Sequence, residues 1–510
     1  MHRMEGRVES FQHLMNGFVV ALSPMNLLYA TLGCLLGTLI GVLPGLGPAA
    51  GTALLIPITF RLDPTGAIIM LAAIYYGAMY GGTITSVLVN VPGEAASVVT
   101  CLDGYQMAKQ GRAGAALGVA AIGSFIGGSV ATLGLVVMAL PLARFALKFG
   151  PPEYFSLLLV GLSLVMALAG KSLSKALVMG VVGLIFSFVG IDPIEGAPRF
   201  DFGITQLLDG IRFVPVVMGF FGIGEILVNA EQSLASVVVG EGKVSSFLPR
   251  REEYRICASA INRGTWLGFF LGLIPGTNSA VASFMSYAIE KKVSKHPEKF
   301  GTGVIEGVAA PETANNAYAN AALIPLFTLG LPGSPTIAIL MGALIMNGLT
   351  PGPLLFQQHA TFVWAVIASL YIGNVILLIL NLPLVGLWVK LLKIPYNILV
   401  VFILVFCIIG AYSLNNSVFD IGMMIFCGLL GYVAKKLDFP LAPAILTLIL
   451  GPMMERSLRE SLSMSRGDYS IFFTRPISLV LLIITAIIFA TSAWQALPSS
   501  IREGSKEAQV

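Results

Sequence analysis

Glycines spaced four residues apart form two matching ladders in this chain. Each ladder ends at a proline–glycine pair, in GCLLGTLIGVLPG (33–45) and in GTWLGFFLGLIPG (264–276), and the two segments align without a gap at an offset of 231 residues. Glycines four apart share one face of a helix, where the missing Cβ lets another helix approach closely. A proline–glycine pair then ends the helix. The sequence therefore predicts two related helices that each stop at a sharp tip.

Both ladders lie in apolar sequence that only a membrane accommodates. Of the 510 residues, 56% are hydrophobic and 11% are charged, whereas a soluble domain carries about 25% charged residues. The clearest apolar runs are 25–44, 64–91, 113–140, 152–170, 172–190, 213–230, 361–389, 397–413 and 475–497, and shorter runs, which half-helices would explain, cover 46–60, 317–331, 335–348, 419–433 and 441–454. We expect an all-α polytopic membrane protein in a lipid bilayer, with roughly ten to twelve membrane segments of about 20 residues.

Each half of the chain also contains a second proline–glycine pair. Pro92-Gly93 lies in the segment SVLVNVPGEA. Pro332-Gly333 lies in the segment FTLGLPGSP. Paired interruptions in two halves of a membrane protein point to the binding site of a transporter, although ordinary glycine and proline kinks are the alternative. We expect one re-entrant hairpin and one broken helix in each half, because non-helical backbone at membrane depth needs burial in protein or a wet cavity.

The longest polar stretch inside the chain precedes the second ladder and is interpreted as a linker. We expect a first transmembrane repeat over 1–240, a cytoplasmic linker over 241–263 and a second transmembrane repeat over 264–510. Four lysines in 290–299 place the loops around the second hairpin in the cytoplasm, because basic loops face that side. The first hairpin has few charges, which favours inverted topology of the two repeats, but the basic residues at the N-terminus leave its orientation open.

The ends that a broken helix creates provide the chemistry of a binding site. One end exposes amide donors, which suit a carboxylate, and the other exposes carbonyl oxygens, which suit Na⁺. Helix capping is the alternative role of the polar side chains there. The candidate residues for substrate and cation binding are Pro44, Gly45, Leu46, Gly47, Asn90, Pro92, Gly93, Pro275, Gly276, Thr277, Asn278, Ser279, Asn316, Pro332, Gly333 and Ser334. The candidate Na⁺ ligands among them are Gly45, Asn90, Asn278 and Ser334.

Two carboxylates lie near these interruptions. Glu94 follows the first break, where it either binds a cation or caps the following helix, and its place before the first helical turn favours the cap. Glu312 and Asn316 share one helical face in a polar segment before the second break. Interhelical hydrogen bonding and a wet path for substrate or ion both explain that segment.

Motifs of enzymes and of nucleotide binding are absent from the sequence. There is no GxSxG, HExxH or GxxxxGK[ST], so we expect no enzyme and no cofactor, apart from a coupling cation, Na⁺ or H⁺. The five cysteines lack metal-binding spacing and are interpreted as packing residues. The net charge of +4 needs no nucleic-acid partner, because the basic residues concentrate in loops.

Several long motifs resemble the large, multi-span permease subunit of the tripartite tricarboxylate transporters. They are GVLPGLGP (41–48), YGGTITSVLVNVPGEAASVVTCLDGYQMAKQGRAG (80–114), GLIPGTNSAVASFMSYAIEKK (272–292), EGVAAPETANNAYANAALIPLFTLGLPGSPTIAILMGAL (306–344) and LGPMMERSLRESL (450–462). The resemblance covers essentially the whole chain and implies a multi-pass protein of the bacterial inner membrane, a cation-coupled secondary transporter that imports tricarboxylates or related carboxylates. It also implies two partners, a small membrane subunit and a periplasmic solute-binding protein that delivers the carboxylate.

A membrane channel or an intramembrane enzyme is the alternative function. An intramembrane hydrolase needs a nucleophile paired with a base, or clustered metal ligands, and the apolar segments show neither. A channel is expected to show flux without saturation or gradient coupling. A scaffolding role would leave four matched interruptions without an explanation.

Overall fold

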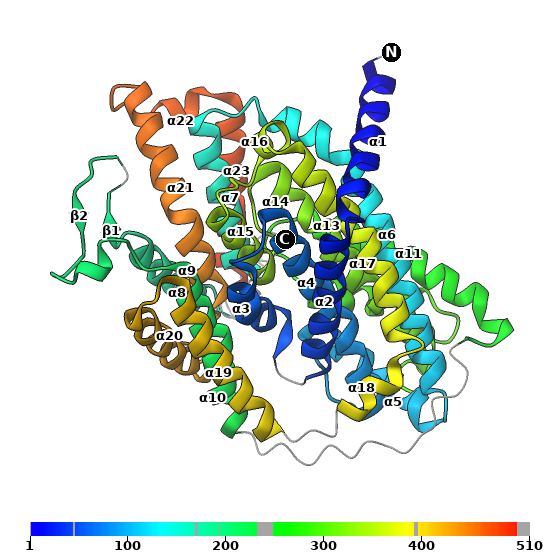
Figure 1. Ribbon diagram of the computed structural model, residues 1–510. Helices are drawn as coiled ribbons and strands as arrows, with labels where there is room; N and C mark the ends of the chain where they lie inside the picture. Colours follow the sequence, from blue (N-terminus) through cyan, green and yellow to red (C-terminus); the bar gives the residue numbers. More distant parts are fainter. Residues whose placement is uncertain are drawn as a thin grey trace, which may run out of the picture. The chain divides into compact units, whose positions relative to one another are not determined.

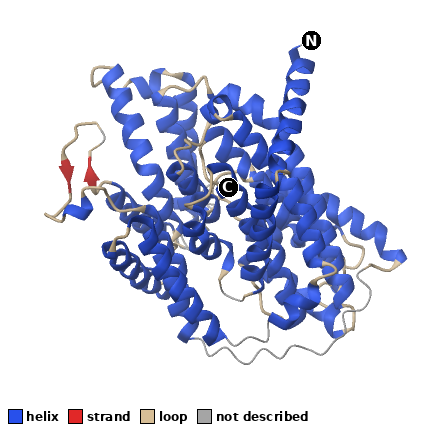
Figure 2. Ribbon diagram, in the orientation of Figure 1, coloured by secondary structure: helices blue, strands red, loops and turns tan. Residues whose placement is uncertain are grey.

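The computed structural model describes residues 2–43, 46–168, 172–192, 194–231, 248–391 and 396–496. Helices form nearly all of the regular structure in these ranges (Figure 2). The exception is an antiparallel pair of short strands, β1 (Gly190–Ile191) and β2 (Pro198–Arg199). Eight described helical segments are long and apolar enough to span a membrane: Pro24–Val42, Pro64–Val89, Ala113–Ala146, Pro151–Leu168, Phe213–Glu231, Ala360–Asn381, Val418–Lys436 and Pro476–Trp494. The predicted all-α polytopic membrane fold is confirmed.

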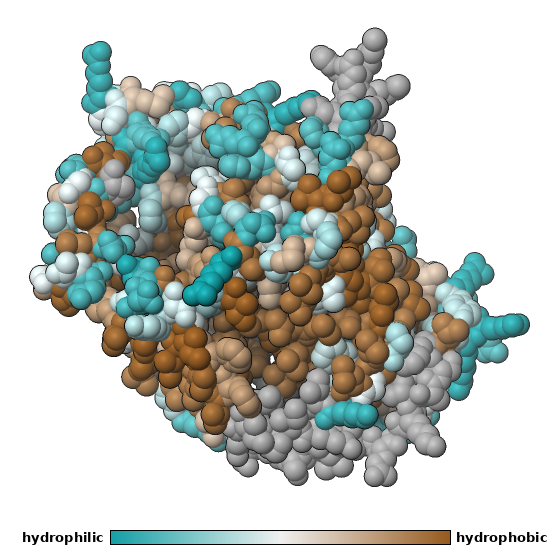
Figure 3. Space-filling view, in the orientation of Figure 1, coloured by the Kyte–Doolittle hydropathy of each residue, from teal (hydrophilic) through white to brown (hydrophobic). Residues whose placement is uncertain are grey.

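Shorter apolar helices accompany these spans: two of them fall on the predicted shorter runs 46–60 and 335–348, whereas the other two fall on the longer runs 172–190 and 397–413. They are Gly47–Thr59, Leu173–Ser187, Pro335–Met346 and Val400–Asn415. Many large apolar side chains remain exposed on the helices, and broad apolar areas cover the face seen in Figure 3. One span is longer than expected, because the helix over the run 419–433 continues through Lys435 and Lys436. Exposed apolar faces of this kind suit contact with lipid.

The chain forms two compact units. The first comprises Met1–Ala146, Val214–Ile274 and Asn278–Tyr432, and the second comprises Leu147–Phe213, Pro275–Thr277 and Val433–Val510. Helices of the first unit up to the linker are α1 (His2–Ala21), α2 (Pro24–Val42), α3 (Gly47–Thr59), α4 (Pro64–Val89), η1 (Ala95–Val98), α5 (Thr100–Lys109), α6 (Ala113–Ala146), α9 (Phe213–Val217), the π-helical turn η3 (Met218–Ile223) and α10 (Gly224–Glu231). Its later helices are η4 (Arg251–Glu253), α11 (Tyr254–Gly272), α12 (Ser279–Val293), η5 (Pro297–Lys299), α13 (Glu306–Ala321), α14 (Leu323–Leu329), α15 (Pro335–Met346), α16 (Pro353–Gln358), α17 (Ala360–Asn381), α18 (Val385–Leu391), α19 (Tyr396–Asn415) and α20 (Val418–Lys436).

The two glycine ladders pack against two long helices of the first unit. α2 lies along α4, and α11 lies along α13 (Figure 1). A Cβ on the ladder glycines within α2 and α11 (Gly33, Gly37, Gly41, Gly264, Gly268 and Gly272) would come closer than 3.0 Å to the facing helix, and for most of them the nearest atom is a backbone carbonyl oxygen. The facing carbonyls belong to Met70, Ile74 and Ala78 in α4 and to Ala310, Ala314 and Tyr318 in α13, so that each pair is 240 positions apart. Both ladders thus serve the same close helix packing, which side chains would prevent.

The helices that face the ladders are the central helices of this unit. α4 is buried from Gly66 to Val87, and α13 is buried from Gly307 to Ala321. α6 packs against α13 and α11, whereas α17 packs against α4 and α2. Each central helix is therefore covered by a long helix from the other half of the sequence.

α11 begins earlier than the sequence suggests. The helix starts at Tyr254, inside the segment interpreted as linker, and ion pairs hold this polar first part. Arg263 binds Glu290 of α12 through two hydrogen bonds, with Nε at 2.8 Å from Oε2. Arg112, just before α6, binds Glu253 at 2.6 Å. Charged pairs of this geometry stabilise a polar helix end that the apolar pattern alone does not predict.

Asp103 of α5 holds the connection between α12 and α13. Its carboxylate accepts hydrogen bonds from the backbone N–H groups of Gly301, Gly303 and Val304 at 2.8 to 3.1 Å. The Tyr287 hydroxyl also donates to it, at 2.8 Å. Asp103 is fully buried, so that these four donors replace the water that a carboxylate would otherwise bind. The equivalent connection in the first half, between α3 and α4, is shorter and does not contain such a loop.

The second unit contains helices and the strand pair. Its elements are α7 (Pro151–Leu168), α8 (Leu173–Ser187), β1, β2, η2 (Thr205–Leu207), α21 (Ala442–Met464), α22 (Ile471–Thr474) and α23 (Pro476–Ala496). α21 packs against α7 and α8, and α23 packs against α7. Glu153 and Arg475 pair at 3.4 Å near the start of α7 and of α23.

Asp192 fixes the β1–β2 hairpin to α21. Its carboxylate accepts hydrogen bonds from the backbone N–H groups of Glu195 at 3.0 Å and Ile194 at 2.7 Å, and from Arg459 of α21 at 2.7 Å. Arg199 of β2 reaches Glu455 of α21 at 2.7 Å. The two amides, followed by the Arg459 guanidinium, hold the pKa of the Asp192 carboxyl well below its usual range.

Asp192→Asn is expected to loosen this hairpin at neutral pH, and acid should do the same to the wild type. Because the pKa is lowered in the folded state, the stabilisation is fully present above the unfolded pKa of about 3.9 and is lost as the pH falls below it. Hydrogen exchange over residues 190–199, corrected for intrinsic rates, measures the effect. Asp209→Asn, in an exposed pair with Arg212, is the matched control. Equal exchange in both variants would contradict the prediction.

Candidate functional site

The two predicted breaks have the same backbone conformation. α4 ends at Asn90 with φ 57° and ψ 30°, and α14 ends at Gly330 with φ 70° and ψ 26°. Four residues later, Glu94 has φ −146° and ψ 169°, and Ser334 has φ −149° and ψ 168°. Asparagine and glycine tolerate the left-handed conformation that stops each helix. The breaks are therefore two copies of one local structure, and they are 240 positions apart like the helix contacts.

Each break lies against the helix that precedes it. A Cβ on Gly93 would collide with the carbonyl oxygen of Gly41 and would come within 2.6 Å of the Cα of Gly82. At the second break, a Cβ on Gly333 would lie 3.7 Å from the Cβ of Ala322, which is the position matching Gly82. The last ladder turn of α2 and the first break are thus in contact.

One turn of α13 joins the two breaks. Asn315 Nδ2 donates a hydrogen bond to Glu94 Oε1 at the first break, at 2.7 Å. Tyr318 Oη donates to the carbonyl oxygen of Gly333 at the second break, at 3.3 Å. Residues three apart in a helix are separated by a rise of about 4.5 Å. Both breaks therefore converge on the same short stretch of the central helix.

Tyr75 of α4 occupies the position equivalent to Asn315 of α13, and it lies at the second break. Tyr75 precedes Asn315 by 240 positions, as Glu94 precedes Ser334. Asn315 bonds to Glu94, and the Tyr75 side chain lies beside that of Ser334 and within electrostatic reach of Glu94. Each central helix thus contacts the break of the other half.

A second pair of contacts follows the same rule. Asn316 of α13 donates to the Ser124 hydroxyl of α6 at 2.7 Å. Tyr76 of α4, 240 positions before Asn316, donates to the carbonyl oxygen of Ser369 in α17 at 3.5 Å. Polar side chains of the central helices therefore bind the covering helices as well as the breaks, which fixes all of these elements around one buried centre.

Glu312 is the second carboxylate of this centre. The Thr83 hydroxyl of α4 donates to its Oε2 at 2.6 Å, and the Thr100 hydroxyl of α5 donates to its Oε1. Ser124 of α6 donates to the Glu312 backbone oxygen at 3.3 Å. The side chain is 1% exposed. Glu312 therefore connects α13 to three other helices at a point that solvent does not reach.

Neither buried carboxylate has a positively charged partner. Among the described residues, the polar partners of Glu94 and Glu312 are hydroxyl and amide groups, and no lysine, arginine or histidine pairs with either. A buried carboxylate without a positive partner costs several kcal/mol unless a proton or a cation neutralises it. In a membrane segment such a group marks an ion or substrate path.

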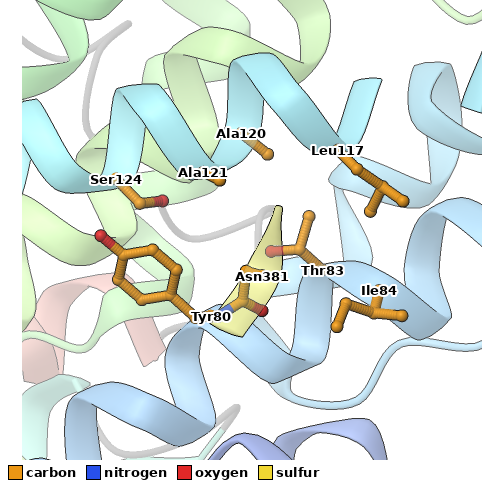
Figure 4. Close-up of a pocket in the computed structure, with 8 residues that line it drawn as sticks. All are labelled: Tyr80, Thr83, Ile84, Leu117, Ala120, Ala121, Ser124 and Asn381. Carbon is orange, nitrogen blue, oxygen red and sulfur yellow. The ribbon is translucent and has the colours of Figure 1, made fainter. Parts of the chain in front are cut away.

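A small cavity lies next to Glu312. It has a volume of about 10 Å³, close to that of a single water-sized sphere. Its lining residues, shown in Figure 4, are Tyr80, Thr83, Ile84, Leu117, Ala120, Ala121, Ser124 and Asn381. Within the described ranges, the Tyr80 hydroxyl and Asn381 Oδ1 are buried without a hydrogen-bond partner. The cavity is therefore lined by both polar and apolar side chains.

The second predicted tip belongs to the second unit. Gly276 has φ 85°, which favours glycine, and a Cβ there would lie 2.7 Å from backbone atoms of Leu164 and Val165 in α7. Thr277 is buried. Asn278 caps α12, because its Oδ1 accepts the Val281 N–H at 2.9 Å. Capping was the alternative role for these side chains, and for Asn278 the structure shows it.

The remaining predicted residues are placed as follows. Pro44 and Gly45 lie outside the described residues, Leu46 is buried, and Gly47 begins α3 with φ 60°. Asn90 is exposed and Pro92 is half-buried, whereas Gly93, Asn316, Pro332 and Gly333 are buried. Pro275 and Ser279 are half-buried, and Ser334 caps α15 through the Ile337 N–H at 3.3 Å. The structure brings the breaks, Asn316 and the end of the first ladder together, and the convergence of both tips on them stays a prediction.

The sequence indicated interhelical hydrogen bonding or a wet path for Glu312, without identifying Thr83 and Thr100 as its partners, and it favoured a cap for Glu94. The Glu94 backbone does pair with Ser97 as in a capping box, but its carboxylate binds Asn315. The signal was a glutamate beside or within a membrane segment, which by itself indicates function. Thr83 and Thr100 gave no such signal, because hydroxyls are common in membrane helices.

No cluster of three or more histidine, cysteine, aspartate or glutamate side chains that could hold a metal occurs in the described part of the chain. Transition-metal chemistry therefore has no ligand set among these residues. A site for a hard monovalent cation uses oxygen atoms instead, and this centre is rich in them.

Comparisons with known proteins point to one family. Residues 27–446 match the tripartite tricarboxylate transporter TctA family. An Agrobacterium vitis protein described as an uncharacterized 52.8 kDa protein in the TAR-I ttuC′ 3′ region is 49% identical over 475 residues, which is 93% of this chain and 94% of that protein. A second protein from the same organism, described as lying in the TAR-II ttuC′ 3′ region, is 49% identical over 42% of this chain and 89% of its own length. No solved structure matches the chain significantly.

Proposed function

The chain belongs to the tripartite tricarboxylate transporter TctA family, and from this premise we propose that it is the large permease subunit of a binding-protein-dependent, cation-coupled secondary transporter. It imports tricarboxylates or related carboxylates across the bacterial inner membrane. A small membrane subunit and a periplasmic solute-binding protein are its partners, as the tripartite family implies. The coupling ion is Na⁺ or H⁺.

One observation carries this proposal most directly: α13 joins two broken helices at a buried centre with two uncompensated carboxylates. The breaks leave helix ends free, and the amides at the start of α15 offer donors for a carboxylate. A carboxylate that leaves water needs such donors and a cation to offset its lost hydration. The negative charge of Glu94 and Glu312 favours a cation. Among the described residues, no permanent positive charge pairs with either carboxylate and would expel that cation.

The site proposed for substrate and cation therefore spans the breaks and their surroundings. It contains Asn90, Pro92, Gly93, Pro332, Gly333 and Ser334 at the breaks, Asn316 in α13, and Gly45, Leu46, Gly47 and Asn278 beside the tips. Support for the breaks comes from their contacts with α13. The tips are included because each of them follows a glycine ladder.

We also infer that the two halves are inverted repeats. The residues of α4 and α13 that face the ladders are 240 positions apart, and so are the two breaks. Each covering helix, α6 or α17, packs on the central helix of the other half. Repeats arranged in this way commonly bind substrate where they meet. Labelling of single cysteines placed at 61 and at 295, from either side of the membrane, tests the inversion. Accessibility of both from the same side would contradict it.

Reconstituted uptake tests the function. The permease, with its small membrane subunit, is placed in liposomes, and accumulation of citrate and other carboxylates is measured with and without the binding protein, under a Na⁺ gradient or a pH gradient. Saturable, gradient-dependent accumulation that requires the binding protein is expected. Non-saturating carboxylate flux that needs neither a Na⁺ gradient nor a pH gradient would indicate a channel. No carboxylate flux under either gradient would overturn the proposal. Protein-free liposomes are the control.

A further inference from the structure

The cavity beside Glu312 has the oxygen atoms of a cation site. Four of its lining side chains present oxygen: Tyr80, Thr83, Ser124 and Asn381, each no more than 5% exposed. They come from α4, α6 and α17, so that three helices contribute. Oxygen atoms gathered from several elements around a space for one small sphere are the usual ligand set of a hard cation.

Each of these oxygens keeps a lone pair for a ligand. Thr83 uses its hydroxyl hydrogen on Glu312, which leaves its lone pairs free. Ser124 donates to the Glu312 carbonyl and accepts from Asn316, and one lone pair remains. The Tyr80 hydroxyl and Asn381 Oδ1 have no partner within the described residues, although Asn381 Nδ2 donates to Leu377 O at 2.8 Å. Orphaned buried acceptors are costly, and a cation would use both.

The nearby carboxylate of Glu312 and the exclusion of solvent favour a cation over an apolar ligand in this cavity. The Glu312 carboxylate lies one hydroxyl away from the cavity, through Thr83. The other lining residues, Ile84, Leu117, Ala120 and Ala121, are apolar. Apolar lining residues lower the local dielectric constant, which strengthens the attraction between the carboxylate and a cation. The space is too small for a carboxylate substrate.

We propose that this cavity binds a single small hard cation, for which Na⁺ is the probe, with Tyr80, Thr83, Ser124 and Asn381 as oxygen ligands and Glu312 as the balancing charge. The role of this cation as coupling ion rests on the proposed function, but its binding does not. A cation here would hold α4, α6 and α17 together next to the helix that joins both breaks. The site differs from the tip and break residues that the sequence indicates.

Binding of radioactive Na⁺ to the purified full-length protein tests the site. Wild type is expected to bind Na⁺ saturably, and Thr83→Val and Tyr80→Phe, which each remove one oxygen with little change of shape, are expected to weaken binding about tenfold or more. Thr328→Val is the matched control, because Thr328 is equally buried and donates only to the Ile324 carbonyl of its own helix. Elution volume in size-exclusion chromatography shows that each variant is folded.

The outcomes separate the site from the function. Unchanged Na⁺ affinity in both folded variants would place the Na⁺ site elsewhere and overturn the inference. A wild type that binds no Na⁺ but accumulates carboxylates under a pH gradient would show a proton-coupled transporter whose cavity holds water only, which overturns the site and keeps the function. Na⁺ binding that both variants weaken, without carboxylate uptake by the wild type, would support the site and overturn the function.

Discussion

Gly268→Leu is expected to prevent the folded protein from accumulating in the membrane. A Cβ at Gly268 would collide with the carbonyl oxygen of Ala314, and it would lie 2.8 Å from the Ala314 Cα and 2.9 Å from its carbonyl carbon. These atoms are backbone of a central helix and cannot move aside as a side chain would. Overpacking of this kind costs about 1–3 kcal/mol, and more where backbones must separate, out of a total stability of roughly 5–15 kcal/mol.

Gly37→Leu should have the same effect, because its Cβ would meet Ile74 in the same way. Gly422→Leu is the control, since Gly422 lies in the span Val418–Lys436 and no atom comes within 4 Å of its added Cβ. Fluorescence-detected size-exclusion chromatography of tagged variants measures folded yield and melting temperature. Wild-type values for Gly268→Leu and Gly37→Leu would show that the ladders do not serve close packing.

Glu312→Gln is expected to abolish gradient-driven accumulation while the protein still folds. The substitution keeps the shape of the side chain but removes the charge that faces Thr83 and Thr100. Loss of one partner from a buried charge pair costs about 2–5 kcal/mol, which corresponds to at least a roughly thirtyfold loss of cation affinity. Uptake at saturating and at limiting cation concentration measures this loss.

Glu195→Gln provides the matched control, because it is the same substitution at an exposed carboxylate in the hairpin. It should leave uptake unchanged. Glu312→Asp adds a further arm: it keeps the charge on a shorter side chain and should retain part of the cation dependence. Cation-driven uptake by Glu312→Gln at the wild-type level would place the balancing charge elsewhere.

The ladders and the breaks could be predicted because their signals are local. Glycine and proline act on the backbone at their own positions, so that Pro92-Gly93 and Pro332-Gly333 mark the breaks without knowledge of the fold. The membrane spans follow from apolar runs for the same reason. The start of α11 was not predicted, because ion pairs of Arg112 with Glu253 and of Arg263 with Glu290 stabilise its polar first part, and no apolar pattern shows such pairs.

The centre itself could not be predicted, because its partners are far apart in the chain. Thr83 and Thr100 are 229 and 212 residues from Glu312. Helical spacing showed that Glu312 and Asn316 share a face, but it could not show what that face meets. The breaks are 240 positions apart and the ladders 231, and the structure explains the difference, since a loop held by Asp103 lengthens the second half between ladder and central helix.

The matched contacts around the breaks differ in chemistry although they agree in geometry. Glu94 and Ser334 occupy equivalent positions with nearly equal dihedral angles, yet one is an acid that binds Asn315 and the other is a hydroxyl beside Tyr75. The two breaks therefore share a backbone conformation but differ in charge. An anion at the centre would be repelled by an ionised Glu94 and admitted at the Ser334 side, so that two breaks with the same backbone conformation present a polar axis between them.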